Sequence, residues 1–233
     1  MDDQFNNTSL SEAHRQLLER DEADSKISNT NKQDLIAKGL VQIPPKRVIN
    51  IDTGSVVGIS NVVDEIVKAL RDNEKIIAID GLSGVGKSST AKALREELSA
   101  LSFSFGEVFR LLCYLEMVRG EKNHQNNLEQ SAYVLTENSL DLHYQDVDVA
   151  HHLSKHINNP DFSCLVPEVA ANNQALVIEF MAKEIEKVAN QCNQKIILEG
   201  RDFTLDFLPC DLRVKLRADS IIRAKRRLSQ SFD

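Results

Sequence analysis

The sequence predicts an α/β fold in which helices cover both faces of a doubly wound parallel sheet of roughly five strands. Three observations predict this fold. Short apolar runs alternate along the chain with segments of helical periodicity, which is the pattern of βα units. The runs at 75–80 and 195–199 are almost continuously apolar, as strands buried on both faces are. Both runs are followed directly by glycine, so each strand ends in a tight turn.

Composition limits the classes of protein that the chain can belong to. Of its 233 residues 42% are hydrophobic and 27% are charged, which indicates one domain, with or without a small lobe. The net charge of -7 argues against a nucleic-acid or anionic-membrane partner. Four widely spaced cysteines, no apolar run of membrane-spanning length and no signal-peptide pattern favour a cytoplasmic protein with reduced thiols. We expect a monomer.

The first third of the chain predicts two helices and one strand. Residues 11–24 have a short apolar stripe and predict a helix, whereas 25–46 predict irregular structure apart from a turn of helix near 32–38. The β-branched run 47–52 predicts a strand. Apolar side chains at helical spacing predict a helix over 61–71.

The remaining elements alternate in type along the chain. We expect strands at 75–80, 101–105, 195–199 and 213–216, and helices at 86–99, 109–119, 147–158, 173–191 and 219–229. Residues 120–147 are polar and show neither the periodicity of a helix nor that of a strand. They are therefore not assigned an element.

The turn after the strand at 75–80 matches the pattern G-x-x-x-x-G-K-[ST]. In such a loop, glycines let backbone N–H groups surround a phosphate, and the next helix presents its positive end. The lysine bridges the β- and γ-phosphates, and the hydroxyl ligates Mg²⁺. The alternative is a tight turn without a ligand. The predicted binding residues are Gly81, Ser83, Gly84, Val85, Gly86, Lys87, Ser88 and Ser89, with Ser88 on Mg²⁺.

The strand at 195–199 supplies a second acidic position. Glu199 or Asp202 is expected near the metal, the alternative being a buried strand whose acidic end has no role. The chain has a match to the guanine-recognition pattern N-K-x-D of GTPases at 31–34, but it precedes the phosphate loop and lies in a segment that predicts a turn of helix and not the end of a strand. The loop therefore indicates a nucleoside triphosphate without identifying its base.

Two segments resemble bacterial cytidylate kinases. IIAIDGLSGVGKSSTAKAL is similar to the family's opening strand, loop and helix, and IILEGRDFTLDFLPCDLRVKLRADSIIRAKRR is similar to its G-R-D segment, next strand and arginine-rich lid. Phe109-Arg110 stands where the family has Tyr-Arg. The resemblance implies a P-loop kinase fold with a small helical acceptor-binding insertion, and ATP and Mg²⁺ as cofactors.

The order of the segments differs from that of the family. LLERDEAD resembles the family's R-D-x-x-D helix, VINIDTG its last strand and ISNVVDEIVKAL its last helix, yet all three precede the phosphate loop here. We therefore expect a circular permutation with its break in the lid. Residues 1–72 would be the family's carboxyl-terminal part, 73–119 and 192–233 the core and lid start, and 120–191 the acceptor-binding insertion. The alternative is an unrelated extension at 1–72 and a truncated carboxyl terminus.

The resemblance assigns roles to further side chains. Gly106, Arg110, Arg201 and Asp202 would face the acceptor nucleotide. Arg20, Asp24, Arg223 and Arg227 would close over the transferring phosphate or the sugar, where an arginine shell stabilises the charge of the transition state. The basic run at 223–227 has the alternative reading of a solvated helix face.

The acceptor lobe departs from the family pattern. No arginine occurs between Arg119 and Arg201, the family's P-x-V-R reads Pro167-Glu168-Val169-Ala170, and its Asp-[TS]-Gly reads Ser104-Phe105-Gly106. The third charge of the lid motif falls near Ile27, with Lys26 as a stand-in. His151, His152 and His156 form a helical cluster, for which a solvated face is favoured over metal binding.

Three functions remain open from the sequence. The first is a kinase that transfers phosphate from ATP to CMP, dCMP or a related small acceptor. The second is a regulatory module that binds a nucleotide without turnover, which the altered acceptor lobe favours. The third is a kinase for a different acceptor.

Overall fold

The computed structural model describes residues 7–136, 139–156 and 159–230. Its centre is a parallel sheet in the order β1-β8-β2-β7-β3. The strands are β1 (Arg47–Asp52), β2 (Ile76–Gly81), β3 (Leu101–Ser104), β7 (Ile196–Glu199) and β8 (Leu212–Arg217). The predicted α/β class and the five strands are confirmed. The β1 strand forms one edge of the sheet, where Arg47 to Asp52 pair in register with Leu212 to Arg217.

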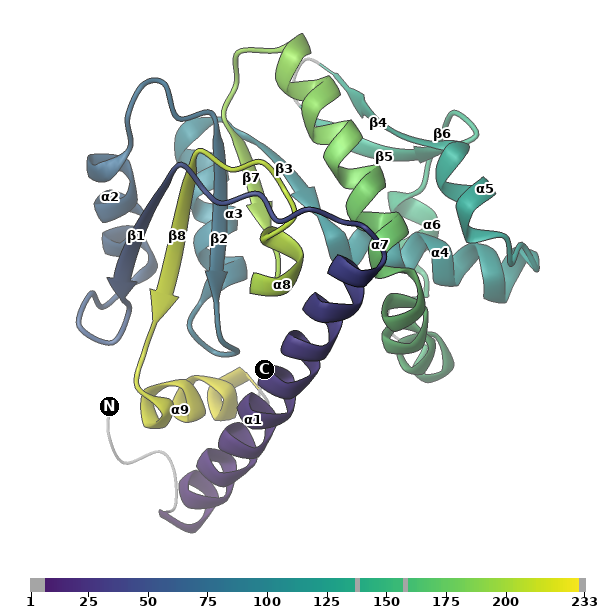
Figure 1. Cartoon of the computed structure of the whole chain (residues 1–233). Coiled ribbons are helices and arrows are strands. Elements are labelled where there is room, and N and C mark those ends of the chain that lie inside the picture. Colours follow the sequence, from purple (N-terminus) through teal and green to yellow (C-terminus); the bar gives the residue numbers. More distant parts are fainter. Residues whose placement is uncertain (1–6, 137–138, 157–158, 231–233) are drawn as a thin grey trace.

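Helices cover both faces of this sheet (Figure 1). On one face α2 (Ile59–Ala69) and α3 (Lys87–Leu98) bury Ile66 and Leu94 against Ile77 and Ile79. On the other face lie α4 (Phe105–Arg119), α7 (Pro160–Gln191), α8 (Asp202–Leu205) and part of α1 (Asn7–Ala37). Alternate residues of each strand face the two cores, which explains the nearly continuous apolar runs.

The α1 helix is longer than predicted. It runs through Ala37, so the irregular structure predicted from residue 25 is wrong there, whereas the turn of helix predicted near 32–38 belongs to the end of α1. Its two buried anchors, Leu17 and Leu35, are 5% and 1% exposed and lie far apart along the helix. Its amino-terminal half packs on α9 (Ser220–Gln230) and its carboxyl-terminal half on α8. Tertiary packing, rather than a continuous apolar stripe, therefore stabilises this helix.

The insertion at 120–191 is not purely helical, which corrects the expectation. It contains α5 (His124–Glu129), α6 (Ala150–Ser154) and the whole of α7, together with an antiparallel sheet in the order β4-β5-β6. The strands of this sheet are β4 (Ser131–Leu135), β5 (Leu140–Tyr144) and β6 (Val147–Asp148). Tyr133 and Leu142 are paired across β4 and β5 and are buried, so the small sheet joins the main core.

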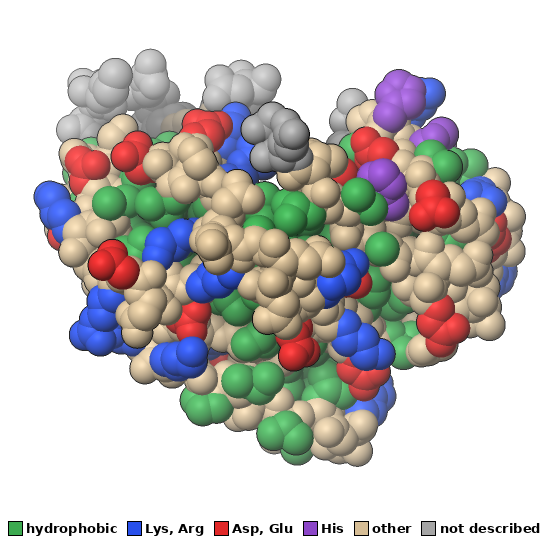
Figure 2. Space-filling view, turned by 90° about the horizontal axis from the view of Figure 1, so that it is seen from above, with side chains coloured by type: hydrophobic (Ala, Val, Ile, Leu, Met, Phe, Trp, Pro, Cys, Tyr) green, Lys and Arg blue, Asp and Glu red, His purple; other side chains and the backbone are tan. Residues whose placement is uncertain are grey.

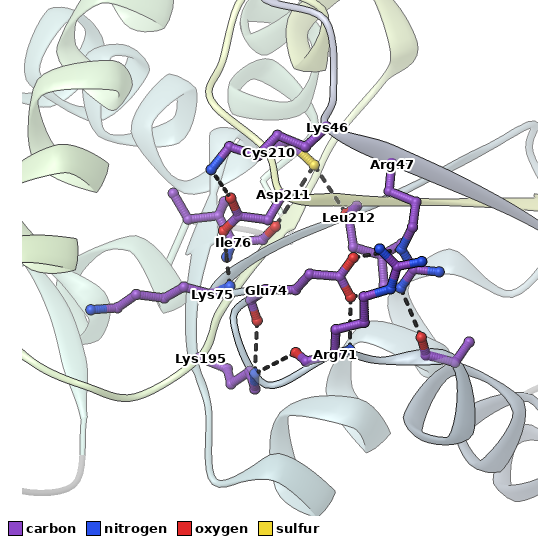
Figure 3. A network of polar contacts seen from close by, with 11 residues as sticks. Lys46, Arg47, Arg71, Glu74, Lys75, Ile76, Lys195, Cys210, Asp211 and Leu212 are labelled. Carbon is purple, nitrogen blue, oxygen red and sulfur yellow. Dashed lines mark hydrogen bonds and ion pairs between the residues drawn. The ribbon is translucent and has the colours of Figure 1, made fainter.

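A polar network closes the end of the sheet at which the parallel strands begin (Figure 3). Glu74 accepts from Arg47 Nε at 2.5 Å and Nη2 at 2.6 Å, and from the Arg71 amide at 2.8 Å. Asp211 accepts from the Lys75 and Ile76 amides, both at 2.8 Å. The network fixes the connection between α2 and β2.

Acidic and basic side chains are interspersed over the face that Figure 2 shows. None of the helices in the described ranges combines the length and the apolar character that a membrane span requires.

Candidate active site

The phosphate loop connects β2 to α3 at the carboxyl end of the strand (Figure 1). Gly81, Gly84 and Gly86 have φ angles of 149°, 81° and 96°, which side-chain-bearing residues rarely adopt. A Cβ atom on Gly81 would lie 2.5 Å from the Leu216 carbonyl oxygen, and one on Gly84 would lie 3.1 Å from that of Arg223. The loop therefore requires its glycines both for backbone conformation and for space.

The carbonyl groups of the loop have donors within the protein. Lys87 Nζ donates to the Gly81 and Leu82 carbonyls at 2.6 and 3.0 Å, and Arg223 Nη1 donates to the Ser83 carbonyl at 3.1 Å. In the described part of the chain, by contrast, the backbone N–H groups of Ser83, Gly84 and Gly86 have no hydrogen-bond acceptor. Such free N–H groups before a helix amino terminus form a site for phosphate oxygens.

Ser88 lies beside an acidic side chain from the neighbouring strand. Its Oγ atom donates to Glu199 Oε1 at 2.5 Å, and Glu199 is the last residue of β7, paired in register with Ile79 of β2. A hydroxyl and a carboxylate are oxygen ligands of the kind that Mg²⁺ takes up together with phosphate oxygens and water. The residues present therefore fit a Mg²⁺ ion, and Glu199 lies beside Ser88, while its role as a metal ligand stays a prediction.

Lys87 is the predicted cation of the loop. Burial lowers the pKa of its ammonium group, against the opposing effect of the Glu199 and Asp80 carboxylates. The charges of Arg201 and Arg227 also lower the pKa of Lys87, so both predicted arginines act electrostatically on this site. The structure thus brings together side chains from β7, α9 and the segment after β7.

Arg223 is buried against the outer side of the loop. Besides the Ser83 carbonyl, its guanidinium contacts Asp21 Oδ2 through Nη2 at 2.7 Å and the Ala218 carbonyl through Nε at 3.2 Å. Its side chain is only 5% exposed, so the reading of a solvated helix face is wrong for this residue. The Asp21 contact joins α1 to α9.

Three predicted side chains lie outside the described residues. The backbone of Arg20 and Asp24 belongs to α1 and that of Asp202 begins α8. The positions of these three side chains are not among those the structure describes.

The predicted acceptor residues Gly106 and Arg110 share the first turns of α4. A Cβ atom on Gly106 would lie 3.7 Å from Arg110 Nη1. Burial raises the pKa of the nearby Glu107 carboxyl, Arg110 lowers it, and Asp141 and Asp148 raise it further. Two carboxylates of the insertion therefore act electrostatically on the start of α4.

Sequence reasoning missed Thr53 and Asp21 as members of the site and did not single out Arg226. Arg226 Nη1 donates to Thr53 Oγ1 at 2.9 Å, and Thr53 Oγ1 lies 3.1 Å from the Val85 carbonyl. Sequence patterns had already singled out the two segments that contain Thr53 and Arg226, namely the D-T-G at the end of the strand at 47–52 and the basic run at 223–227. Their contact could not be found by local pattern, because 173 positions separate the two residues.

The histidine cluster lies on the insertion. The His152 and His156 rings have centroids 5.9 and 5.6 Å from that of Tyr114, and His156 also contacts Phe162 at 6.0 Å. The described residues include no group of three or more metal-ligating side chains.

Comparison with known proteins identifies the family. The family profile described as "Cytidylate kinase" matches residues 77–233, which is well over half of the chain. The chain belongs to the cytidylate kinase family. It is therefore a phosphotransferase of that family, and the predicted kinase, transferase and nucleotide-binding character is confirmed.

Curated relatives agree with this assignment. The cytidylate kinase of Ureaplasma urealyticum serovar 10 (strain ATCC 33699 / Western) is 32% identical over 165 residues, covering 67% of this chain and 69% of the relative. That of Mesomycoplasma hyopneumoniae (strain 7448) is 30% identical and covers 66% and 67%. The bifunctional pantoate ligase/cytidylate kinase of Prochlorococcus marinus (strain MIT 9301) is 28% identical over 210 residues, covering 87% of this chain and 40% of the relative.

Proposed function

We propose that this member of the cytidylate kinase family transfers the γ-phosphate of ATP to CMP, dCMP or a related nucleoside monophosphate. The observation that carries the proposal is the phosphate loop, in which the N–H groups of Ser83, Gly84 and Gly86 have no acceptor among the described residues. Matched relatives named cytidylate kinase support CMP as the acceptor.

The donor phosphates would be bound by the loop and by Lys87. In this proposal the free N–H groups donate hydrogen bonds to the β-phosphate oxygens, and Lys87 Nζ turns from the Gly81 and Leu82 carbonyls toward the β- and γ-phosphates. Ser88 and Glu199 would hold Mg²⁺, which, when bound, neutralises charge on the phosphate oxygens. Little covalent chemistry is required of the protein, because such transfer depends on positioning and electrostatic stabilisation.

The remaining residues of the proposed site bind the acceptor and stabilise charge. Gly106, Arg110, Arg201 and Asp202 would hold the acceptor, whereas Arg20, Asp24, Arg223 and Arg227 would surround the transferring group. The charges of Arg201 and Arg227 both lower the pKa of Lys87, which supports a place for both near the bound phosphates. Arg223 would contribute through Ser83 and Asp21, with which it is already bonded.

One observation favours a different acceptor. The acceptor lobe has no arginine from 120 to 200, and Asp141 and Asp148 raise the pKa of Glu107 near Arg110. Carboxylates at this place oppose the binding of a phosphate dianion. An acceptor with fewer negative charges than a monophosphate, such as a nucleoside, is therefore the second candidate.

An acceptor panel separates these functions. The purified chain is incubated with ATP and Mg²⁺ plus nucleosides, nucleoside monophosphates or other small acceptors, and ADP formation is measured against a Lys87→Ala variant. Lys87-dependent ADP formation with CMP or dCMP alone is the expected result. ADP formation with nucleosides alone would support the second candidate, and ATP binding without any acceptor-dependent ADP would indicate a regulatory module.

We further propose that the chain is a permuted form of the family domain with its break in the lid. Residues 1–72 would supply the family's last strand and helix, 73–119 and 192–233 the core and lid start, and 120–191 the acceptor lobe. The pairing of β1 with β8 supports this, since the last strand is expected beside the one that follows the G-R-D segment. The packing of α1 on α9 also supports it. The family match begins at residue 77, which both the permutation and the unrelated extension predict.

A rearranged chain tests the permutation. It begins at Asn73, runs to Asp233 and continues directly into Met1 to Asp72. We expect it to fold and to bind ATP with the dissociation constant of the original chain, while 73–233 alone fails to fold, because Ile51, Val62 and Ile66 complete one core. A stable, ATP-binding 73–233 fragment would instead support an unrelated extension.

A further inference from the structure

Thr53 and Arg226 meet on the outer side of the phosphate loop. Arg226 donates through Nη1 to Thr53 Oγ1 at 2.9 Å and through Nη2 to the Thr53 carbonyl at 2.6 Å. The same Nη1 lies 3.4 Å from the Val85 carbonyl and 3.5 Å from that of Gly84. Thr53 is 3% exposed, so this contact is shielded from water.

The chemistry of the two side chains fixes the direction of each hydrogen bond. A guanidinium has only donors, and a hydroxyl has one donor and two lone pairs. The Thr53 hydroxyl must therefore accept from Arg226, and its single hydrogen is directed to the Val85 carbonyl at 3.1 Å or to that of Arg217 at 3.2 Å. Arg226 thus leaves the Thr53 hydroxyl as a donor to one of these two carbonyls. The Arg217 carbonyl already accepts from the Thr53 amide at 2.8 Å, so the shorter contact, to Val85 in the loop, is taken as the hydroxyl's bond.

The carbonyl that receives this bond lies between two glycines of positive φ, Gly84 and Gly86. Because each peptide unit is planar, holding the Val85 carbonyl on the outer side also fixes the N–H of Gly86, which belongs to the same peptide group. That N–H is one of the donors without an acceptor among the described residues. A bond that holds the Val85 carbonyl therefore also sets the direction of the Gly86 N–H, which is available to a phosphate.

We propose that Arg226, acting through Thr53, is a positioning residue for the donor nucleotide: it keeps the Val85–Gly86 peptide turned so that its N–H faces the bound phosphates. Arg226 does not touch the phosphates itself. The inference rests on the proposed function, because it concerns the same phosphate loop. It adds that a residue of the segment before the loop, Thr53, sets the affinity for the donor.

Calorimetric titration of the full chain with ATP and Mg²⁺ tests the proposal. The variants are Arg226→Lys, which keeps the charge but cannot donate from two nitrogens in one plane, and Thr53→Val, which removes the hydroxyl at nearly constant shape. Thr53→Ser restores the hydroxyl. Lys92→Ala, an exposed position on α3, is the matched control. Thermal unfolding is recorded first, and titrations are made well below every midpoint.

We expect the dissociation constant of ATP to rise about tenfold in Arg226→Lys and in Thr53→Val. The double variant should bind ATP about as tightly as the single variant with the lower affinity, because the two residues form one chain of hydrogen bonds. Thr53→Ser and Lys92→Ala should bind as the original chain does. The KM of the acceptor should stay unchanged while the KM of ATP rises.

Two results would overturn the inference, and they are distinguishable. If the original chain binds ATP and the folded Arg226→Lys and Thr53→Val variants bind it equally well, the pair is only structural. If the original chain binds no ATP, both the proposed function and the inference fail. If either Arg226→Lys or Thr53→Val does not fold, the ATP affinity of the other variant decides whether the pair is only structural or positions the loop.

Discussion

Glu74→Gln is expected to destabilise the protein without changing nucleotide binding. The Glu74 side chain is 6% exposed and forms a two-pronged ion pair with Arg47, whose side chain is 22% exposed. Its carboxylate also accepts from the Arg71 amide. Glutamine keeps the shape and one acceptor oxygen but removes the charge. The Arg47 guanidinium then loses its counter-charge and retains neutral acceptors, the amide oxygen and the Ala69 carbonyl at 2.7 Å.

The magnitude follows from this geometry. Removing one partner of a buried ion pair costs about 3–5 kcal/mol, because the other charge is left uncompensated. Partial exposure of Arg47 places the cost at the lower end, about 3 kcal/mol. For a chain of this length such a loss lowers the melting temperature by roughly 6–12 °C. ATP affinity should not change, because the network lies where the strands begin and the phosphate loop follows the end of β2 (Figure 3).

Urea unfolding at pH 7 measures the effect, with Glu65→Gln as the matched control. Glu65 lies in α2, the helix before Glu74, and pairs with Lys68 at 3.4 Å, but both side chains are more than half exposed. The control should therefore cost less than about 0.5 kcal/mol. The reasoning is refuted if Glu74→Gln costs no more than Glu65→Gln, or if it weakens ATP binding while the protein is fully folded.

Three further predictions concern the loop and the pH dependence of stability. Gly84→Ala should cost about 1–2 kcal/mol in urea unfolding and weaken ATP binding, because φ is 81° and the new Cβ would lie 3.1 Å from the Arg223 carbonyl; unchanged values for both would contradict it. Ser88→Ala should raise the Mg²⁺ concentration for half-maximal rate at least about tenfold, whereas an unaltered Mg²⁺ titration would remove Ser88 from the metal site. The hydrogen bonds from Arg47 hold the pKa of Glu74 below its ordinary value of 4.5, so the stability that the pair contributes is present above that pH and lost as the pH falls through the lower, folded value. Urea midpoints between pH 7 and pH 3 should therefore depend less on pH in Glu74→Gln, and equal dependence in both proteins would count against the pair.

The strands and the phosphate loop could be predicted because their signals are local. An apolar run followed by Gly81 and the pattern ending at Ser88 contain the strand, the turn and the start of α3 within a few residues. The positive φ angles of Gly81 and Gly86 are the physical reason for the two glycines of that pattern. The expected position of Glu199 followed in the same way from the end of a neighbouring strand.

The long α1 helix could not be predicted in this way. Its anchors Leu17 and Leu35 contact different elements, and the polar residues between them show no apolar stripe. The β4–β6 sheet was missed for a related reason. Its strands are short, and their buried members, such as Tyr133, become recognisable only where they pack on Phe103 at a ring-centroid distance of 4.6 Å.

The site was predicted as a set of residues but not as a set of contacts. Arg223 was selected from the basic run and lies against the loop, where its catalytic role stays a prediction, but its partner Asp21 is 202 positions away. Thr53 reaches the loop only because β1 lies beside β8 at the edge of the sheet. Such pairings depend on topology, which no local pattern contains.

Transfer of labelled phosphate tests the central claim most directly. The full chain is incubated with γ-labelled ATP, Mg²⁺ and CMP, and the products are separated. We predict that the label appears in CDP with the original chain and not with Lys87→Ala. Label that stays in ATP, or appears only as free phosphate at a rate independent of CMP and of Lys87, would contradict the assignment of this loop to phosphoryl transfer onto a nucleoside monophosphate.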